Sequence, residues 1–155
     1  FDPILNLPSR TEEKLELAIG SATAPRPLLR RAGWYLRDPL QVTRDPWSFQ
    51  RYIEQSKAEF TVAKQGYVIS NSGWFSERSA NYRASGRPVV TQQTGFSRWL
   101  QADAGVMPFN TAEEALSAIE NVSAHYDAHC RAAREIVHEY FDANKVLEQL
   151  LNKID

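Results

Sequence analysis

Apolar residues recur at every third or fourth position over several segments, which predicts helices with one buried face. The longest apolar stripe begins at Ala115 and continues through Ile119 and Val122 to Tyr140, with a break expected near Ser123. The pattern predicts helices over residues 9–22, 44–57, 77–85, 111–140 and 143–154.

Residues that favour helix N-termini stand at the start of these segments. Asp45 precedes Pro46, and proline suits the first helical position. Ser76 is a natural N-cap, and Thr111 with Glu114 three residues later forms a capping box. Ser9 or Thr11 is expected to cap the first helix, with Leu15, Ala18 and Ile19 as its apolar stripe, and Trp47, Phe49, Tyr52 and Ile53 are expected to form the buried face of the second.

Short apolar segments between the helices predict strands. Phe60 and Val62 alternate with Thr61 and Ala63, and residues 66–70 are expected to extend or follow that strand. Further strands are expected within 28–36 and over 88–92 and 105–109. Because strands alternate with helices, the sequence predicts an α/β fold, a Rossmann-like three-layer domain with a mainly parallel sheet and C-terminal helices. No internal linker divides residues 1–155, so one domain is expected.

The composition of the chain argues against several classes of protein. The 155 residues carry 18 basic and 19 acidic side chains, and this balance argues against a general nucleic-acid binder or a polybasic membrane-docking protein. No apolar run is long enough to span a bilayer. Cys130 is the single cysteine, so an intrachain disulfide is excluded, and a reducing, cytoplasmic location is expected. Cys130 lies on the apolar stripe and is expected in the core.

The segment around the helix that begins after Ser76 has features of an anion site. In a parallel α/β sheet, ligands bind beyond the carboxyl ends of the strands. Gly73 would let the backbone approach a ligand, and the first helical N–H groups, at Ser76 and Glu77, carry partial positive charge. Arg78 and Ser79 add side-chain donors, so the segment could hold a diphosphate. The alternative is a capped surface helix with Trp74 and Phe75 as a hydrophobic staple.

Two further positions lie at strand ends. Thr94 and Gly95 follow the strand over 88–92, and they could bring a hydroxyl and a backbone N–H to a polar ligand. Lys64 follows the strand that contains Phe60 and could reach a phosphate. A plain turn and a solvated lysine are the respective alternatives.

His125 and His129 stand four residues apart, as two zinc ligands on one helix would. No glutamate adjoins His125 to complete a metalloprotease motif, so no metal site is expected.

Residues 59–150 resemble the C-terminal domain of a GT-B glycosyltransferase. The resemblance rests on a glycine-containing loop that leads into a helix, a strand after that helix, a Thr-Gly loop and a second helix start. The matching residues are Gly73, then Ala84, Gly86, Pro88, Val89 and Val90, then Thr94 and Gly95, and finally Phe109, Thr111, Glu113, Glu114 and Ala115.

This resemblance implies a nucleotide-sugar donor site, with the diphosphate on the helix near Ser76 and the sugar near Thr94 and Gly95. Many retaining members carry two glutamates where this chain has Gly73 and Asn81. Asn81 could still bond a ribose hydroxyl, but more weakly than a carboxylate would. The residues expected at the donor site are Lys64, Gly73, Trp74, Phe75, Ser76, Glu77, Arg78, Ser79, Asn81, Thr94 and Gly95.

The resemblance also implies a second, N-terminal acceptor-binding domain outside this chain, because GT-B enzymes react in a cleft between two domains. Residues 1–155 would then be the C-terminal half of a glycosyltransferase, inactive alone, which transfers a sugar to an unknown acceptor. The alternative is a non-catalytic Rossmann-like module that binds a nucleotide or a protein.

Overall fold

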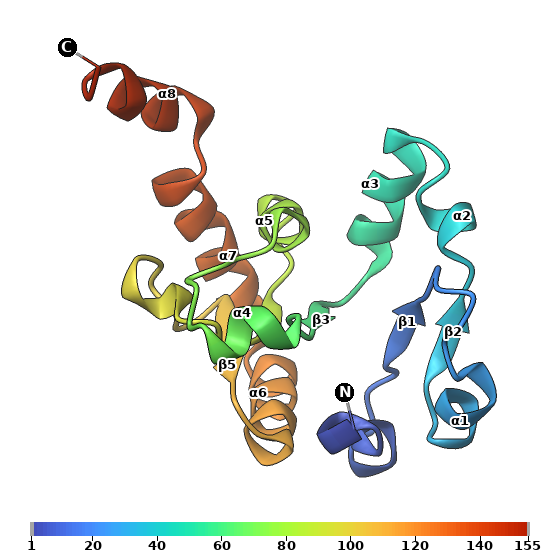
Figure 1. The fold of residues 1–155 in the computed structure, drawn as a ribbon. Coiled ribbons are helices and arrows are strands. Elements are labelled where there is room, and N and C mark those ends of the chain that lie inside the picture. Colours follow the sequence, from blue (N-terminus) through green and yellow to red (C-terminus); the bar gives the residue numbers. More distant parts are fainter. Residues whose placement is uncertain (1, 155) are drawn as a thin grey trace.

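The computed structural model describes residues 2–154 as strands enclosed by helices (Figure 1). All of the strand pairs are parallel, which confirms the predicted α/β class. One sheet pairs β1 with β2, and the other has the order β3-β4-β5. The strands are β1 (Glu16–Ala18), β2 (Tyr35–Arg37), β3 (Glu59–Thr61), β4 (Val89–Gln92) and β5 (Val106–Phe109).

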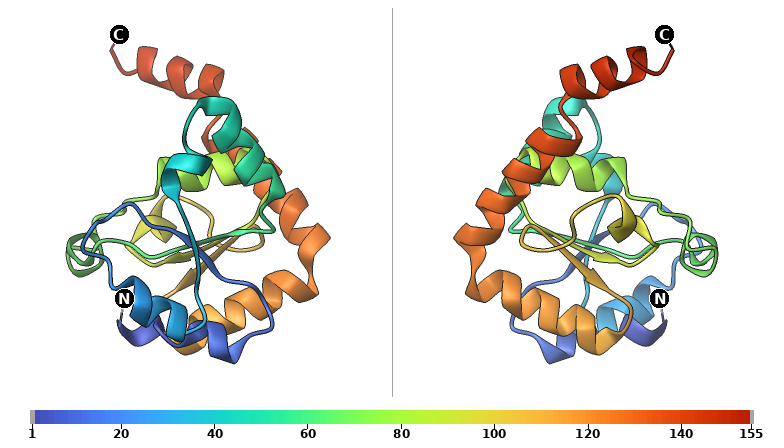
Figure 2. Two further views of the ribbon diagram at one scale, coloured as in Figure 1. Left: turned by 90° about the vertical axis from the view of Figure 1, so that its right-hand side faces the viewer. Right: turned by 90° about the vertical axis from the view of Figure 1, so that its left-hand side faces the viewer.

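Helices cover both faces of the strand layer (Figure 2). On one face lie α3 and α5, and on the other lie α1, α6 and the N-terminal 3-10 helices. The helices are α1 (Arg26–Arg31), α2 (Pro39–Val42), α3 (Pro46–Gln55), α4 (Gln65–Ile69), α5 (Glu77–Ala84), α6 (Ala112–Ala124), α7 (Tyr126–Tyr140) and α8 (Ala143–Leu151), with 3-10 turns at Asp2–Ile4, Leu7–Arg10 and Phe96–Arg98.

Alternating side chains of β4 reach both layers, because successive residues of a strand point to opposite faces. Val89 packs with Ile53 of α3 and Tyr82 of α5. Val90 belongs to the larger core, which includes Ile119 of α6. The strand is therefore buried on both faces, as strands of parallel sheets usually are.

The predicted caps of three helices are confirmed. Asp45 Oδ1 accepts a hydrogen bond from the Ser48 N–H at 2.7 Å, and Ser76 Oγ accepts one from the Arg78 N–H at 3.2 Å. Thr111 Oγ1 accepts the Glu114 N–H at 3.1 Å. The Glu114 carboxylate accepts from the backbone N–H of Asn110 at 2.6 Å, which supplies the second bond at this helix start.

The predicted helix over 9–22 is wrong. A 3-10 helix ends at Arg10, and the chain then extends into β1. Leu15, Leu17 and Ile19 alternate with polar or small residues, and this strand spacing is met by pairing with β2. In so short a segment, the apolar positions fit the repeat of a helix and the repeat of a strand alike.

Two other expectations need correction. Residues 28–36 contain only the start of β2, because α1 occupies Arg26–Arg31 with Pro27 in its first turn. Residues 66–70 lie mostly in helix α4 instead of extending β3. Trp47 is 69% exposed, so the buried face of α3 depends on Ile53 and the partly buried Phe49.

The C-terminal helices form as predicted, and the break near Ser123 falls at His125. Helix α8 projects away from the strand layer (Figures 1 and 2). Its apolar side chains, among them Leu147, Leu150 and Leu151, are exposed. Within residues 2–154, no helix combines the length and apolar character that crossing a bilayer requires.

Candidate functional site

The candidate site lies at the carboxyl ends of β3 and β4. After β3 the chain passes Lys64, turns through α4 and the loop 70–75, and enters α5. After β4 it forms the loop 93–95. Both loops therefore emerge at the edge of the parallel sheet where ligands of α/β proteins usually bind.

Hydrogen bonds join these two loops directly. The Gly73 N–H donates to the Thr94 carbonyl at 2.7 Å, and the Thr94 hydroxyl donates to the Trp74 carbonyl. The Trp99 indole N–H donates to the Gly73 carbonyl at 2.8 Å. Gly73 has φ +77°, a conformation that favours glycine. The structure thus brings together the two loops that the sequence placed on neighbouring strands.

Thr94 anchors this corner from the inside. Its side chain is only 1% exposed, and its hydroxyl is used by the Trp74 carbonyl. The backbone N–H groups of Thr94 and Gly95 both donate to the Gln93 amide oxygen, at 3.0 and 2.8 Å. The expectation that the Thr94 hydroxyl and the Gly95 N–H serve a ligand is therefore corrected, because both have partners within the loop.

Ser79 faces the interior of the protein. Its side chain is fully buried, and its hydroxyl has no hydrogen-bond partner among the residues that the structure describes. One turn later Arg83 is also fully buried, with its Cζ 5.6 Å from the ring centroid of Phe75 and 5.5 Å from that of Phe141. The expected roles of Ser79 and Phe75 at a ligand are thus corrected, because both belong to the contact between α5 and the C-terminal helices.

Arg78 is held by two partners on β3. Its Nε donates to Glu59 Oε1 at 2.5 Å, and its Nη2 donates to Thr61 Oγ1 at 2.7 Å. The Arg78 side chain remains 49% exposed, whereas that of Glu59 is 4% exposed. The guanidinium is therefore fixed in direction, with Nη1 free of any bond to described residues, but part of its charge is neutralised by Glu59.

The remaining predicted residues surround this corner. Lys64, Glu77 and Asn81 are exposed, and Trp74 stacks on Tyr67 of α4 with ring centroids 4.9 Å apart. Ser76 is buried and serves as the cap of α5. Lys64, the exposed part of Arg78 and the first turn of α5 are thus the groups that can meet an anion.

A cavity of about 950 Å³ separates the two sheets, with β1 on one side and β3 on the other. We call it the inter-sheet groove, because residues of both strands line it. Figure 1 shows where β1 and β3 lie in the fold. Arg78, which bonds Glu59 and Thr61 of β3, also lines the groove, so the groove adjoins the candidate site. Its lining includes residues 15–19 and 58–62, with Val90, Ile119 and Val122 on one face and Tyr52 and Tyr82 on the other.

Side chains from distant segments meet across this groove. Glu16 of β1 accepts from the Tyr52 hydroxyl at 2.8 Å and from Arg37 Nη2 at 2.9 Å. Burial opposes ionisation of Glu16, but the bonds from Arg37 and Tyr52 outweigh it and lower the carboxyl pKa. Burial and the bond to Glu16 raise the pKa of Tyr52. The sequence did not predict this group of residues, because Glu16 was expected in a helix.

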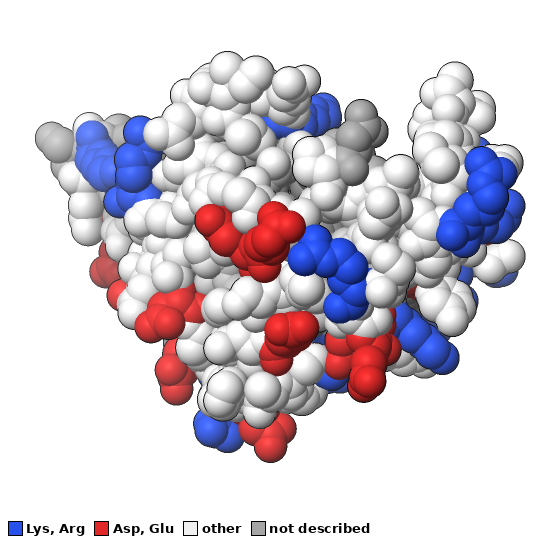
Figure 3. Space-filling model, turned by 90° about the horizontal axis from the view of Figure 1, so that it is seen from below, with Lys and Arg blue, Asp and Glu red and all other residues white. Residues whose placement is uncertain are grey.

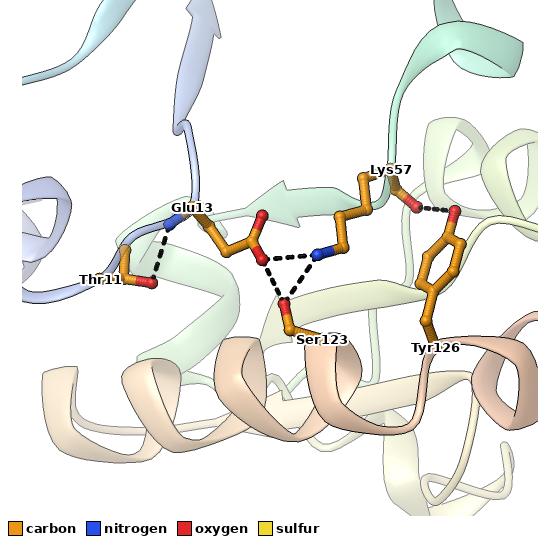
Figure 4. Close-up of polar contacts among 5 residues, drawn as sticks. All are labelled: Thr11, Glu13, Lys57, Ser123 and Tyr126. Carbon is orange, nitrogen blue, oxygen red and sulfur yellow. Dashed lines mark hydrogen bonds and ion pairs between the residues drawn. The ribbon is translucent and has the colours of Figure 1, made fainter.

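A second polar cluster spans the amino ends of β1 and β3 (Figure 4). Lys57 Nζ lies 2.5 Å from Glu13 Oε1, and the Ser123 hydroxyl of α6 donates to the same oxygen at 2.5 Å. These two bonds lower the pKa of Glu13. The Tyr126 hydroxyl donates to the Lys57 carbonyl at 2.8 Å. The cluster therefore fixes the separation of the two sheets at this end.

His129 has a structural position. Its Nδ1 accepts the Gly105 N–H at 3.0 Å, and its Nε2 lies 2.8 Å from Asn121 Oδ1. Both ring nitrogens are thus engaged, while His125 is exposed. Within residues 2–154 no three His, Cys, Asp or Glu side chains gather as metal ligands would.

Acidic and basic side chains are interspersed over the face that Figure 3 shows. This face has no continuous basic surface of the kind that polyanion binders present. Comparisons of the chain with profiles of known protein families, with curated protein sequences and with solved structures found no match.

Proposed function

We propose that this chain binds the diphosphate of a nucleotide-sugar at the carboxyl ends of β3 and β4, as the donor-binding half of a glycosyltransferase. The observation that carries the proposal is that Lys64, the Gly73 loop and the first turn of α5 with Arg78 all follow β3, where the Gly73 loop joins the loop after β4. Anions bind at such helix N-termini because the first N–H groups lack intrahelical partners.

The order of the strands supports this position. The first sheet extends from β1 to β2, and the second extends from β3 to β5 on the far side of the inter-sheet groove. Successive strands are therefore added in one direction after β1 and in the opposite direction after β3. In open α/β sheets, ligands bind in the crevice at such a reversal, and β3, one of the two strands that carry the proposed site, borders it.

The residues take different parts in this proposal. The N–H groups of Ser76 and Glu77 and the cations Lys64 and Arg78 contact the diphosphate, and the Trp74 ring, stacked on Tyr67, borders the site. Asn81, exposed on α5, is available to a ribose hydroxyl. These groups would stabilise the diphosphate as it leaves the sugar. The acceptor and any catalytic base would come from outside this chain.

The test is calorimetric titration with a panel of nucleoside diphosphates and their free nucleosides. The diphosphates are expected to bind more tightly, in the micromolar to millimolar range, because half of the cleft is absent. Equal affinity for diphosphate and nucleoside would refute the diphosphate site. Diphosphate binding without sugar transfer, in a protein joined to its acceptor domain, would favour a non-catalytic nucleotide-binding module.

Variants localise the site. Lys64→Ala is expected to weaken diphosphate binding about tenfold, which corresponds to about 1.4 kcal/mol. Glu77→Gln is expected to strengthen it, because a negative charge is removed from the first turn of α5. Lys153→Ala removes the same charge as Lys64→Ala from the C-terminal segment and serves as the matched control. If Lys64→Ala and Lys153→Ala bind alike, the site lies elsewhere.

A further inference from the structure

We propose that the inter-sheet groove binds an extended peptide of a protein partner as a central parallel strand, which joins the two sheets into one. The groove is bounded by two strand edges, and strand edges with unpaired backbone groups readily accept another strand. This inference does not rest on the proposed function, although Arg78 lines the groove and also belongs to the proposed diphosphate site.

The hydrogen-bond register shows which backbone groups face the groove. The Tyr35 N–H donates to the Leu15 carbonyl, so Leu15 and Leu17 are the β1 residues whose backbone bonds to β2. Backbone groups alternate between the two sides of a parallel strand. The N–H and C=O of Glu16 and Ala18 therefore point into the groove.

The same reasoning applies to β3. The Glu59 N–H donates to the Pro88 carbonyl at 3.0 Å, so the backbone of Glu59 and Thr61 bonds to β4. The N–H and C=O of Phe60 then point the other way, into the groove. Among the described residues, none of these groove-facing groups of Glu16, Ala18 and Phe60 has a hydrogen-bond partner. The two edges thus offer a complementary set of donors and acceptors to a strand laid between them.

The two faces of the groove specify the side chains of that strand. Leu15, Leu17 and Phe60 belong to the core that includes Ile119 and Val122 of α6, so one face of the groove is apolar. On the other face Glu16 bonds Tyr52, and Glu59 bonds Arg78. The fitting peptide alternates apolar side chains toward α6 with polar side chains toward Tyr52 and Arg78.

A buried oxygen of Glu59 also favours hydrogen-bond donors on the polar side of the bound strand. Glu59 lines the groove, and its Oε2 is buried without a hydrogen-bond partner within residues 2–154. Buried polar groups are normally paired. This oxygen is closed to solvent before the peptide binds, so a hydroxyl or ammonium group of the bound strand would reach it only after the Glu59 side chain turns toward the groove.

The groove exists before the peptide arrives. The Glu13–Lys57 pair with Ser123 spans it at one end, and the Glu16–Tyr52 bond spans its polar face. These contacts hold β1 and β3 apart without bringing their backbones together. Binding therefore requires little rearrangement of the sheets.

The probe is a short synthetic peptide of alternating valine and threonine with a lysine at each end. Hydrogen exchange measured by NMR is expected to slow at least tenfold at the amides of Ala18 and Phe60 when the peptide is added. The Thr61 amide, which already bonds to β4, should change little. Added peptide at millimolar concentration that leaves the Ala18 and Phe60 amides unprotected would overturn the proposal.

Two N-methylated peptides distinguish a central strand from a strand added at an outer edge. One is methylated at every valine and the other at every threonine. A central strand uses both sets of N–H groups, so both peptides should bind at least tenfold more weakly than the parent. If methylation of only one set weakens binding, the peptide lies at an outer edge, and the proposal is wrong.

A matched pair of protein variants completes the test. Ala18→Pro removes an N–H that faces the groove and leaves the β1–β2 bonds intact, because proline is tolerated at an edge. It should weaken peptide binding about tenfold, whereas Ala18→Val should not. If the Ala18 and Phe60 amides instead become protected as the concentration of protein alone rises, a second copy occupies the groove and the proposal fails.

Discussion

Nε of Arg78, in the first turn of α5, lies 2.5 Å from Oε1 of Glu59, in the first position of β3. Thr61, two residues along the same strand, accepts a second bond from the guanidinium. One side chain thus connects the N-terminus of a helix with the strand that precedes it. The connection sets the direction of α5 at the proposed anion site and also forms part of the polar face of the inter-sheet groove.

Arg78→Ala is expected to lower the free energy of unfolding by about 1–3 kcal/mol, the usual cost of leaving a buried polar group unpaired. The reason is that the Glu59 side chain is buried and would lose its ion-pair partner. In the Glu59→Gln background the same change should cost less, because the amide is neutral. Urea unfolding of the four proteins of this double-mutant cycle measures the difference. Equal losses in both backgrounds would mean that the pair is not coupled.

Gly105→Ala is expected to destabilise the fold by about 2–5 kcal/mol. Gly105 has φ +88°, and an added Cβ would lie 2.6 Å from the backbone nitrogen of Ala133 in α7. Strained backbone and overpacking each cost about 1–3 kcal/mol. Gly66→Ala in α4 is the control, because among the described residues an added Cβ would have no neighbour within 4 Å beyond its chain neighbours and the backbone of its own helix. Thermal melting should show a loss for the first variant and no loss for the second.

The stability of the protein is expected to fall as pH decreases from about 7 toward 5. Burial lowers the pKa of His129 below its usual 6.5, and nearby His125 adds to this effect while Asp103 opposes it. The unfolded chain therefore takes up a proton at a higher pH than the folded chain does. The contribution of His129 is complete above the unfolded pKa and is lost as pH falls through it toward the folded pKa.

Urea unfolding across this pH range measures the effect. His129→Gln should reduce the slope of stability against pH, which for one proton cannot exceed about 1.36 kcal/mol per pH unit. His125→Gln removes an exposed histidine and should change the slope less. A slope that survives His129→Gln would assign the pH dependence to other groups.

Arg83→Met is expected to leave the protein as stable as the parent or to raise its stability by about 1–2 kcal/mol. Burial lowers the pKa of Arg83 to about 10, and no polar partner for its guanidinium lies among the described residues. A long apolar side chain keeps the contacts with Phe75 and Phe141 and removes a buried charge. Arg83→Ala, which leaves a cavity, should instead cost about 2–4 kcal/mol. Melting temperatures of the two variants test this prediction. A large loss of stability in Arg83→Met would contradict it and would indicate an anionic partner of Arg83.

Local signals in the sequence were sufficient for much of the strand and helix order. Asp45, Ser76 and Thr111 cap their helices as predicted because each cap bonds an N–H only two or three residues away. The strand at Val89–Gln92 was also recognisable, since a short apolar run between Pro88 and a turn has few alternatives in an α/β chain. These features depend on neighbours along the chain.

The candidate site was only partly predictable. The sequence placed the Gly73 and Thr94 loops at one edge of the sheet, and the structure joins them. It did not show that Ser79 points inward, because that depends on where α7 packs against α5. Glu59 gave no signal, since its partner Arg78 lies 19 residues later and is reached only after the chain folds back.

What the sequence by itself determined is the parallel α/β class, three helix starts and the positions of β3, β4 and β5. What only the tertiary structure decided is the state of residues 9–22 and the division of the strands into two sheets. Leu15, Leu17 and Ile19 are compatible with strand and helix alike in so short a segment. The pairing of Glu16 with Tyr35 selects the strand, and that pairing depends on contacts between residues far apart in the chain, which no local pattern records.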